Sequence, residues 1–239
     1  IPFSDVYRFH VEWSANEKVA FEIAAGAAMS GVRSVFITKH VGMNVASDPL
    51  IHVSYAGINA GMLIISSDDP GIFNSNVEED SRFYARLAEI PGIEVDDQQE
   101  AKDVIAYALS VSEHTKLPVF IRVTNRILYG RGKVVFGEVQ DILPQKVEFD
   151  KEKARWFIAG PTAVKRHAWL HEQFASSRNL AEQSCFNSVE WAEHKRYGII
   201  AAGIGYYYTK EVINSLQVKN KISVLKLGFF NPLPVNFIK

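Results

Sequence analysis

The chain has 239 residues, with 26 Lys and Arg against 27 Asp and Glu, so its formal net charge is -1. The basic residues are scattered along the sequence, and no uninterrupted apolar run approaches the roughly 20 residues that a membrane helix needs. These features exclude a nucleic-acid-binding tail and a membrane span, so we expect no nucleic-acid partner, no membrane partner and a cytoplasmic location.

Strands and helices alternate in the first 130 residues, where short β-branched or aromatic runs are separated by segments of helical period. The expected strands are 6–11, 34–38, 62–66, 93–96 and 118–123, and the expected helices are 16–29, 48–60, 81–89 and 98–115. This alternation predicts an α/β fold with a doubly wound, mostly parallel sheet. Such sheets bind ligands at the carboxyl ends of their strands, which here are followed by the segments 12–16, 39–47, 67–80 and 124–132.

The pattern changes after residue 132 to an extended segment over 133–139 and a polar, Pro-containing connection to residue 153. A polar helix over about 163–181, a strand over 197–202, a helix over 206–216 and a strand over 222–227 follow. We therefore predict a first domain over 1–140, a linker and helical segment over 141–195, and the start of a second α/β domain over 196–239.

The sequence contains one cysteine, Cys185, which excludes an intrachain disulfide and any iron–sulfur cluster held by several thiolates of this chain. The chain starts without Met inside an expected strand and stops just after another strand. We therefore expect it to be part of a longer protein.

Glu17 is the first candidate for a functional residue. Ser14 and Glu17 have the spacing of a capping box at the start of the first helix, and a helix N-terminus favours a carboxylate in any case. The alternative is that Glu17 lies at the carboxyl end of the preceding strand, where this fold binds its ligand.

Two uncommon strings point to a family. Residues 11–24 (VEWSANEKVAFEIA) and 38–50 (TKHVGMNVASDPL) closely resemble the large subunit of indolepyruvate:ferredoxin oxidoreductases, which are thiamine-diphosphate-dependent 2-oxoacid:ferredoxin oxidoreductases. Further agreement at 68–70, 80–82 and 118–122, and again at 225–229 with 232–234, extends the resemblance to nearly the whole chain.

The resemblance implies a thiamine-diphosphate pyrimidine-binding domain over 1–140 and the start of a transketolase C-terminal-like domain over 196–239. It also implies that Glu17 is the catalytic carboxylate, which meets N1′ of the aminopyrimidine and promotes loss of the C2 proton of thiamine diphosphate. The loop that follows the strand would cover the cofactor, so His40, Gly42 and Asn44 are candidates for cofactor binding. The alternative is a turn stabilised by Gly42, with His40 hydrogen-bonded to backbone.

The segment over 68–82 is too long and polar to be a simple connector, and loops of this kind often carry function. By the resemblance, His40, Asn76 and Arg82 are candidates for contact with the substrate. Arg82 is equally suited to pair with Asp80 or Glu78. Phe73 and Asn76 replace a histidine and a glutamine that the family leads us to expect, so the preferred oxoacid stays open.

The resemblance further implies that the complete enzyme oxidatively decarboxylates aryl 2-oxoacids to acyl-CoA. Its partners would be a smaller subunit, ferredoxin and coenzyme A, within an oligomer. The Gly-Asp-Gly motif that holds Mg²⁺ and the diphosphate is absent from these residues, as are the cluster cysteines. We therefore expect Mg²⁺ and iron–sulfur clusters only in the complete enzyme, no metal ligands in this chain, and no activity of the fragment alone.

Two other interpretations stay open. Gly203 and Gly205 imitate a dinucleotide-binding fingerprint, although Tyr208 replaces its third glycine, so the chain could be a nucleotide-binding oxidoreductase module. It could also be a non-catalytic paralogue or assembly domain with the same fold. His167 and His171 lie four residues apart on an expected helix, but without the Glu of a zincin pair, and we expect them to be solvated.

Overall fold

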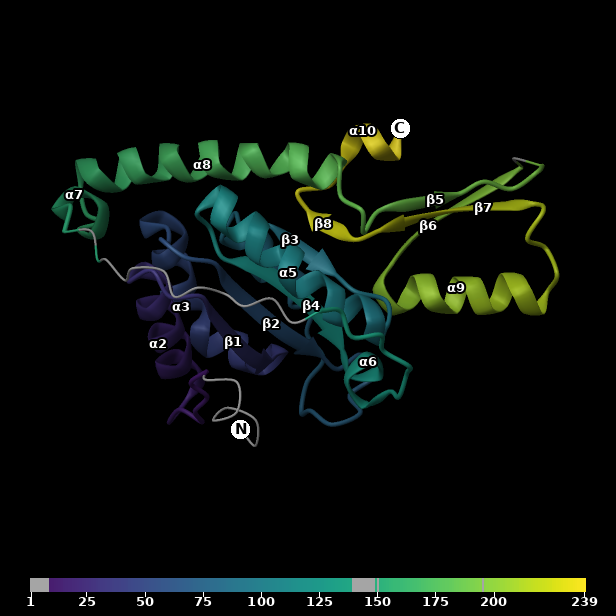
Figure 1. Ribbon diagram of the computed structural model, residues 1–239, viewed down its shortest axis with the longest axis horizontal. Coiled ribbons are helices and arrows are strands. Elements are labelled where there is room, and N and C mark those ends of the chain that lie inside the picture. The colour runs from purple at the N-terminus through teal and green to yellow at the C-terminus, as the bar shows by residue number, and fades with distance from the viewer. Residues whose placement is uncertain (1–8, 139–148, 150, 195) are drawn as a thin grey trace.

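The computed structural model describes residues 9–138, 149, 151–194 and 196–239, and these form two sheets flanked by helices (Figure 1). The first sheet has the order β1-β2-β4-β3-β8. Its strands are β1 (Ser34–Lys39), β2 (Met62–Asp68), β4 (Val119–Thr124), β3 (Gly92–Glu94) and β8 (Phe229–Asn231). All pairs are parallel except that of β3 with β8. The predicted doubly wound, mostly parallel sheet is confirmed.

Helices cover both faces of this sheet because successive side chains of a strand point to opposite sides. On one face, Ile64 and Phe120 belong to a core completed by α2 (Glu17–Met29) and α3 (His40–Ala56). On the other face, Ile121 belongs to a core completed by α5 (Gln98–Thr115). The central strands are therefore buried on both faces, which explains their continuous apolar sequences.

The second sheet has the order β5-β7-β6 and lies beside the first sheet (Figure 1). Its elements are β5 (Ser188–Glu190), β6 (Tyr197–Ala202), β7 (Ile222–Leu227) and the adjacent helix α9 (Gly203–Ser215). The shorter helices of the chain are α4 (Arg82–Leu87), α6 (Asn125–Tyr129), α7 (Lys153–Trp156) and α10 (Val235–Ile238). Within the described ranges, every helix is too short or too polar to cross a membrane.

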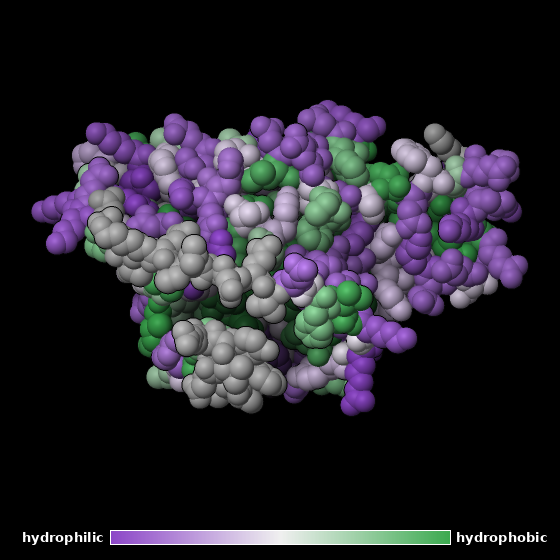
Figure 2. Space-filling view, viewed as in Figure 1, coloured by the Kyte–Doolittle hydropathy of each residue, from purple (hydrophilic) through white to green (hydrophobic). Residues whose placement is uncertain are grey.

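Helix α8 (Pro161–Glu182) runs along the ends of α3 and α5 (Figure 1). Leu170 joins the core on the α3 side and Ala181 joins the core on the α5 side. The surface along this helix is mostly hydrophilic (Figure 2). The polar helix expected over about 163–181 is therefore present, and it belongs to the layer that covers the first sheet.

Helix α3 begins at His40, so the expectation of a loop over 39–47 and a helix start at Asp48 is wrong. A Pro directly after an Asp is typical of a helix start, yet Pro49 lies inside α3 and supplies no N–H there. Met43 and Ala46 are fully buried. Burial of residues 40–47 outweighs the local signal for a helix start at Asp48. The loop that was expected to cover the cofactor is therefore replaced by the first two turns of α3.

Most other expected elements lie within three residues of their predicted bounds. The strand expected over 6–11 is not found at residues 9–11, and its remaining residues lie outside the described ones. Residues 133–138, which were expected to be extended, form no strand. The predicted connection to residue 153 lies largely outside the described residues, which omit 139–148 and 150.

A buried ion cluster joins the second sheet to the segment after β3 and the start of α5. Lys226 of β7 lies 2.8 Å from an Asp96 oxygen and 2.5 Å from a Glu100 oxygen at the start of α5. One cation thus faces two carboxylates. Burial raises the pKa of Glu100 to about 8, and the neighbouring Asp96 carboxylate adds to the rise while Lys226 opposes it.

We expect the free energy of unfolding to fall as the pH rises from about 5 to about 9 because of Glu100. Its pKa in the folded chain, about 8, exceeds the ordinary value of 4.5, so the folded chain binds more protons than the unfolded chain between these values. The contribution is therefore complete below the ordinary value and is lost as the pH rises through the folded value. Glu100→Gln, which resembles the protonated acid, should flatten the slope by up to about 1 kcal/mol per pH unit.

Urea unfolding at several pH values measures this slope. The control is Glu211→Gln, an exposed position on α9, which should keep the slope of the unchanged chain. Equal slopes for Glu100→Gln and the unchanged chain would contradict the assignment.

Candidate functional site

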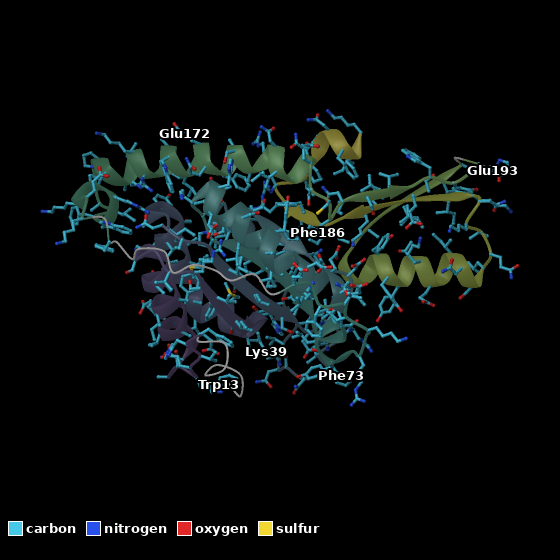
Figure 3. All side chains as sticks on the ribbon, viewed as in Figure 1. Trp13, Lys39, Phe73, Glu172, Phe186 and Glu193 are labelled. Carbon is cyan, nitrogen blue, oxygen red and sulfur yellow. The ribbon has the colours of Figure 1, made fainter. Side chains whose placement is uncertain are left out.

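The carboxyl ends of β1, β2 and β4 lie at one edge of the first sheet, together with the start of α3. Figure 3 shows Lys39, the last residue of β1, on the same side of the molecule as Trp13 and Phe73. Glu172 of α8 lies on the opposite side. This edge is where a doubly wound sheet binds its ligand.

Glu17 and Gly42 lie together at this edge. Gly42 is buried, and a Cβ atom built on it would lie 2.6 Å from Cγ of Glu17 and closer still to Oγ1 of Thr38. The Glu17 side chain is half-buried. Among the residues that the structure describes, none forms a hydrogen bond or ion pair with its carboxylate. The site thus holds a carboxylate that is available to an external hydrogen-bonding group.

The predicted capping box is wrong. The N-cap of α2 is Asn16, whose side-chain oxygen accepts a hydrogen bond of 3.0 Å from the amide of Val19. Ser14 instead donates to Glu12 at 2.9 Å. Since Asn16 performs the capping, Glu17 has no local structural role of that kind.

We expect Gly42→Ala to lower the free energy of unfolding by about 1–3 kcal/mol, because its methyl group would collide with Thr38 and Glu17. Gly26 provides a matched control in α2, because open space surrounds its position. Gly26→Ala should stabilise the chain by about 0.5–1 kcal/mol, since Ala favours a helix interior. Urea unfolding compares the two variants, and a stable Gly42→Ala chain would show that Glu17 does not lie against this glycine.

His40 is fully buried at the first turn of α3. Its Nδ1 lies 3.2 Å from the carbonyl oxygen of Ser67, and its Nε2 lies 2.9 Å from that of Val77. A neutral imidazole carries one N–H and can donate to one carbonyl at a time. The predicted alternative, in which His40 is hydrogen-bonded to backbone, is therefore what the structure shows.

Two other predicted contact residues, Asn44 and Asn76, are exposed. Asn44 lies one turn after His40, donates to Glu79 at 2.8 Å and accepts a hydrogen bond from the Tyr84 hydroxyl. Asn76 is exposed on the segment between β2 and α4. The structure therefore joins Glu17 with Gly42, and it joins His40 and Asn44 with the segment that follows β2.

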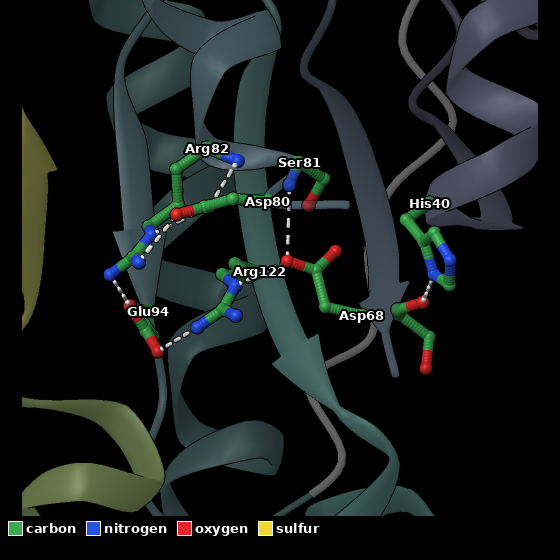
Figure 4. A network of polar contacts seen from close by, with 8 residues as sticks. His40, Asp68, Asp80, Ser81, Arg82, Glu94 and Arg122 are labelled. Atoms are coloured by element: carbon green, nitrogen blue, oxygen red, sulfur yellow. Dashed lines mark hydrogen bonds and ion pairs between the residues drawn. The ribbon is translucent and has the colours of Figure 1, made fainter. Parts of the chain in front are cut away.

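Arg82 is held by carboxylates of the chain. Its Nε and Nη2 donate to the two oxygens of Asp80 at 2.8 and 2.6 Å, and its Nη1 donates to Glu94 at 3.2 Å (Figure 4). The predicted pairing with Asp80 is confirmed. Glu78 does not share in it and accepts a hydrogen bond of 3.0 Å from the amide of Gly71.

Arg122 completes a buried network that the sequence analysis missed. Its Nε donates to Asp68 at 2.6 Å, and its Nη1 donates to Glu94 (Figure 4). The same Asp68 oxygen accepts a hydrogen bond of 3.1 Å from the amide of Ser81. The available signal was an Arg inside the apolar string of β4, which in a doubly buried strand requires a carboxylate partner.

Asp69 organises the segment after β2. It is buried, and it accepts hydrogen bonds from the amides of Phe73 at 3.1 Å and Asn74 at 2.6 Å. The Asn125 side chain donates to it at 2.5 Å. Burial alone would raise the pKa of Asp69, but the hydrogen bonds from Asn74 and its neighbours outweigh it and lower the pKa. The carboxylate therefore holds this turn in place.

The N-terminus of α9 is covered by Glu94. Gly203 starts this helix with a φ of +51°, and a Cβ atom on it would lie 2.7 Å from Cδ of Glu94. Dinucleotide-binding folds place a phosphate in front of the corresponding helix. Because a carboxylate lies there in this chain, the geometry disfavours the nucleotide-binding interpretation.

The architecture matches solved enzymes of one class. Over 98% of the chain it resembles the 2-oxoglutarate:ferredoxin oxidoreductase of Magnetococcus marinus, with a TM-score of 0.68, 15% identity and 48% of that chain covered. Over 99% of the chain it also resembles a split-gene transketolase that was solved as an inactive tetramer of beta subunits. The TM-score is 0.59, the identity is 14%, and 63% of that chain is covered. These enzymes share the thiamine-diphosphate-binding fold, and the chain has this fold as well.

Sequence relatives narrow the class. The chain is 40% identical over 238 residues to indolepyruvate oxidoreductase subunit IorA of Pyrococcus abyssi. The alignment covers 96% of the chain and 36% of that subunit. It is 39% identical over 230 residues to the subunit of the same name from Methanothermobacter marburgensis. That alignment covers 96% of the chain and 37% of the subunit. No family profile matches the chain. The resemblance to indolepyruvate:ferredoxin oxidoreductase large subunits is confirmed, and the chain spans about 36% of the relatives' length.

Proposed function

We propose that the chain is part of the large subunit of a thiamine-diphosphate-dependent 2-oxoacid:ferredoxin oxidoreductase that acts on indolepyruvate or another aryl pyruvate. The observation that carries this proposal is the 40% identity to an indolepyruvate oxidoreductase subunit along 96% of the chain. The complete protein would oxidatively decarboxylate the oxoacid to acyl-CoA and pass the electrons to ferredoxin.

Glu17 and Gly42 fit the aminopyrimidine ring of thiamine diphosphate. Glu17 is half-buried, and its carboxylate has no partner among the described residues, so it can hydrogen-bond a ring nitrogen. When bound, thiamine diphosphate would supply a nucleophilic carbon that adds to the ketone of an oxoacid. Glu17 would hold a proton at the ring nitrogen, and its partial burial limits competition by water for that hydrogen bond.

The other residues that were predicted to contact cofactor or substrate have positioning roles or exposed positions in this proposal. His40 and Arg82 would position the segment after β2, since carbonyl groups engage the His40 ring and carboxylates engage the Arg82 guanidinium. Asn44 has an exposed position beside Glu79 and would reach a cofactor only by giving up this hydrogen bond. Asn76 is exposed and remains available to contact the substrate.

We also propose that residues 1–140 are the pyrimidine-binding domain, 141–195 a linker and helical segment, and 196–239 the start of a transketolase C-terminal-like domain. The Mg²⁺-bound diphosphate and the iron–sulfur clusters would be held by other parts of the assembly. Three exposed apolar side chains, Trp13, Ile37 and Phe73, lie on or near β1 and the segment after β2, where they are available to a partner subunit, and Trp13 is 90% exposed.

Reconstitution of the full-length protein with its smaller subunit tests the proposal. We expect ferredoxin reduction that requires both an aryl 2-oxoacid and coenzyme A. An intact complex that binds thiamine diphosphate without oxoacid-dependent reduction would instead indicate a non-catalytic paralogue. Saturable NAD(P) binding without thiamine binding would indicate the nucleotide-binding module.

A further inference from the structure

A second cluster of ligating side chains lies far from Glu17, where α8 crosses the connection between α4 and β3. Glu89 of that connection has one oxygen 3.0 Å from Nε2 of His171 and the other 3.9 Å from Nε2 of His167. One ligating atom from each of the three residues lies within 4.8 Å of the others. Both histidines are exposed and Glu89 is half-buried, so ions from solution can reach the cluster.

The backbone conformation at Glu89 indicates that the residue is present for its side chain. Glu89 follows the C-cap of α4 and has a φ of +53°, a conformation that favours glycine. Its amide donates to Arg86 at 3.3 Å and the next amide, of Ile90, donates to Ala85 at 3.1 Å, which is the bonding pattern of a Schellman motif. The backbone conformation therefore disfavours Glu at this position. The contact of its carboxylate with two imidazoles of α8 explains why Glu stands there and not Gly.

The imidazoles are also arranged for a shared ligand. His167 and His171 are one helical turn apart, and their ring centroids are separated by 4.3 Å. Tyr55 of α3 stacks on His167 with a centroid distance of 5.1 Å and an interplanar angle of 15°. This stacking restricts the rotation of the His167 ring and so lowers the entropy lost on binding.

We propose that Glu89, His167 and His171 bind one divalent transition-metal ion of the Zn²⁺ type. Tetrahedral Zn²⁺ with bonds of about 2.0–2.2 Å places its ligand atoms about 3.3 Å apart, so small side-chain rotations close the site and water completes it. Two imidazoles with one carboxylate suit Zn²⁺ and its neighbours, whereas Mg²⁺ and Ca²⁺ prefer oxygen ligands. The ion fastens α8 to the first sheet through the connection after α4.

Titration of the intact chain with Zn²⁺ against a chromophoric chelator tests the site. We expect one ion per chain, and an affinity that falls by at least about tenfold in His167→Ala and in His171→Ala. His52→Ala is the matched control, because His52 faces Asp48 at 3.5 Å, also four residues apart on a helix, and no third ligand joins this pair among the residues that the structure describes. This variant should bind Zn²⁺ as the unchanged chain does, and Mg²⁺ should not compete.

Glu89→Gly separates loss of the site from loss of folding. Glycine favours the positive φ, so this variant should be at least as stable as the unchanged chain without metal, yet bind Zn²⁺ at least about tenfold more weakly. Zn²⁺ should raise the melting temperature of the unchanged chain and leave that of Glu89→Gly where it is. Equal Zn²⁺ affinities of the unchanged chain and either His171→Ala or Glu89→Gly would overturn the proposal.

Discussion

Glu17→Gln in the full-length assembly is expected to lower oxoacid-dependent turnover by roughly a hundredfold or more and to leave the fold intact. Gln keeps the size of Glu17 and can still fill the space beside Gly42. It has no acidic proton to exchange with the aminopyrimidine, so deprotonation at C2 of the bound thiamine should slow. Initial rates of ferredoxin reduction give the turnover, and deuterium exchange at the thiamine C2 position follows that deprotonation directly.

The control for this experiment lies on the same helix. Glu22 is exposed on α2, and Glu22→Gln should retain the rate of the unchanged protein. Both variants should give the same far-ultraviolet circular dichroism and the same assembly. Unchanged turnover and C2 exchange in Glu17→Gln would reject the role of this carboxylate, while the fold assignment would stand.

Arg122→Met should lower the free energy of unfolding by about 3–5 kcal/mol, because it leaves buried carboxylates without their cation. The side chains of Asp68 and Glu94 are 1% and 3% exposed, so water cannot replace the guanidinium. Arg82 reaches Glu94 at 3.2 Å, but it does not replace the bond of 2.6 Å between Arg122 and Asp68. Urea unfolding measures the loss.

An exposed ion pair provides the comparison. Arg33 lies 2.7 Å from Glu113, with side chains 38% and 29% exposed, and Arg33→Met should cost at most about 1 kcal/mol. A triple variant that combines Asp68→Asn, Glu94→Gln and Arg122→Met neutralises the carboxylates together with the arginine. It should recover much of the stability that Arg122→Met loses. A cost for Arg122→Met as small as that for Arg33→Met would show that the network does not stabilise the fold.

Local patterns in the sequence were enough for most of the fold. The apolar strings at β2 and β4 and the helical period of α5 each specify an element through a few neighbouring residues, and their alternation implies a parallel sheet. Glu17 could also be placed at the ligand-binding edge, because it lies within the string over 11–24 that carries a specific family resemblance. Its proximity to Gly42 agrees with that placement.

Contacts between distant residues decided the rest. The start of α3 depends on burial of Met43 and Ala46 in the core, which outweighs the local helix-start signal at Asp48 and Pro49. Residues near one another in the sequence set the propensity for a helix or strand, whereas partners of buried charges and ligands of an ion come together only when the elements pack. For this reason no local pattern could predict that Arg122 binds Asp68, or that Glu89 meets two histidines of α8.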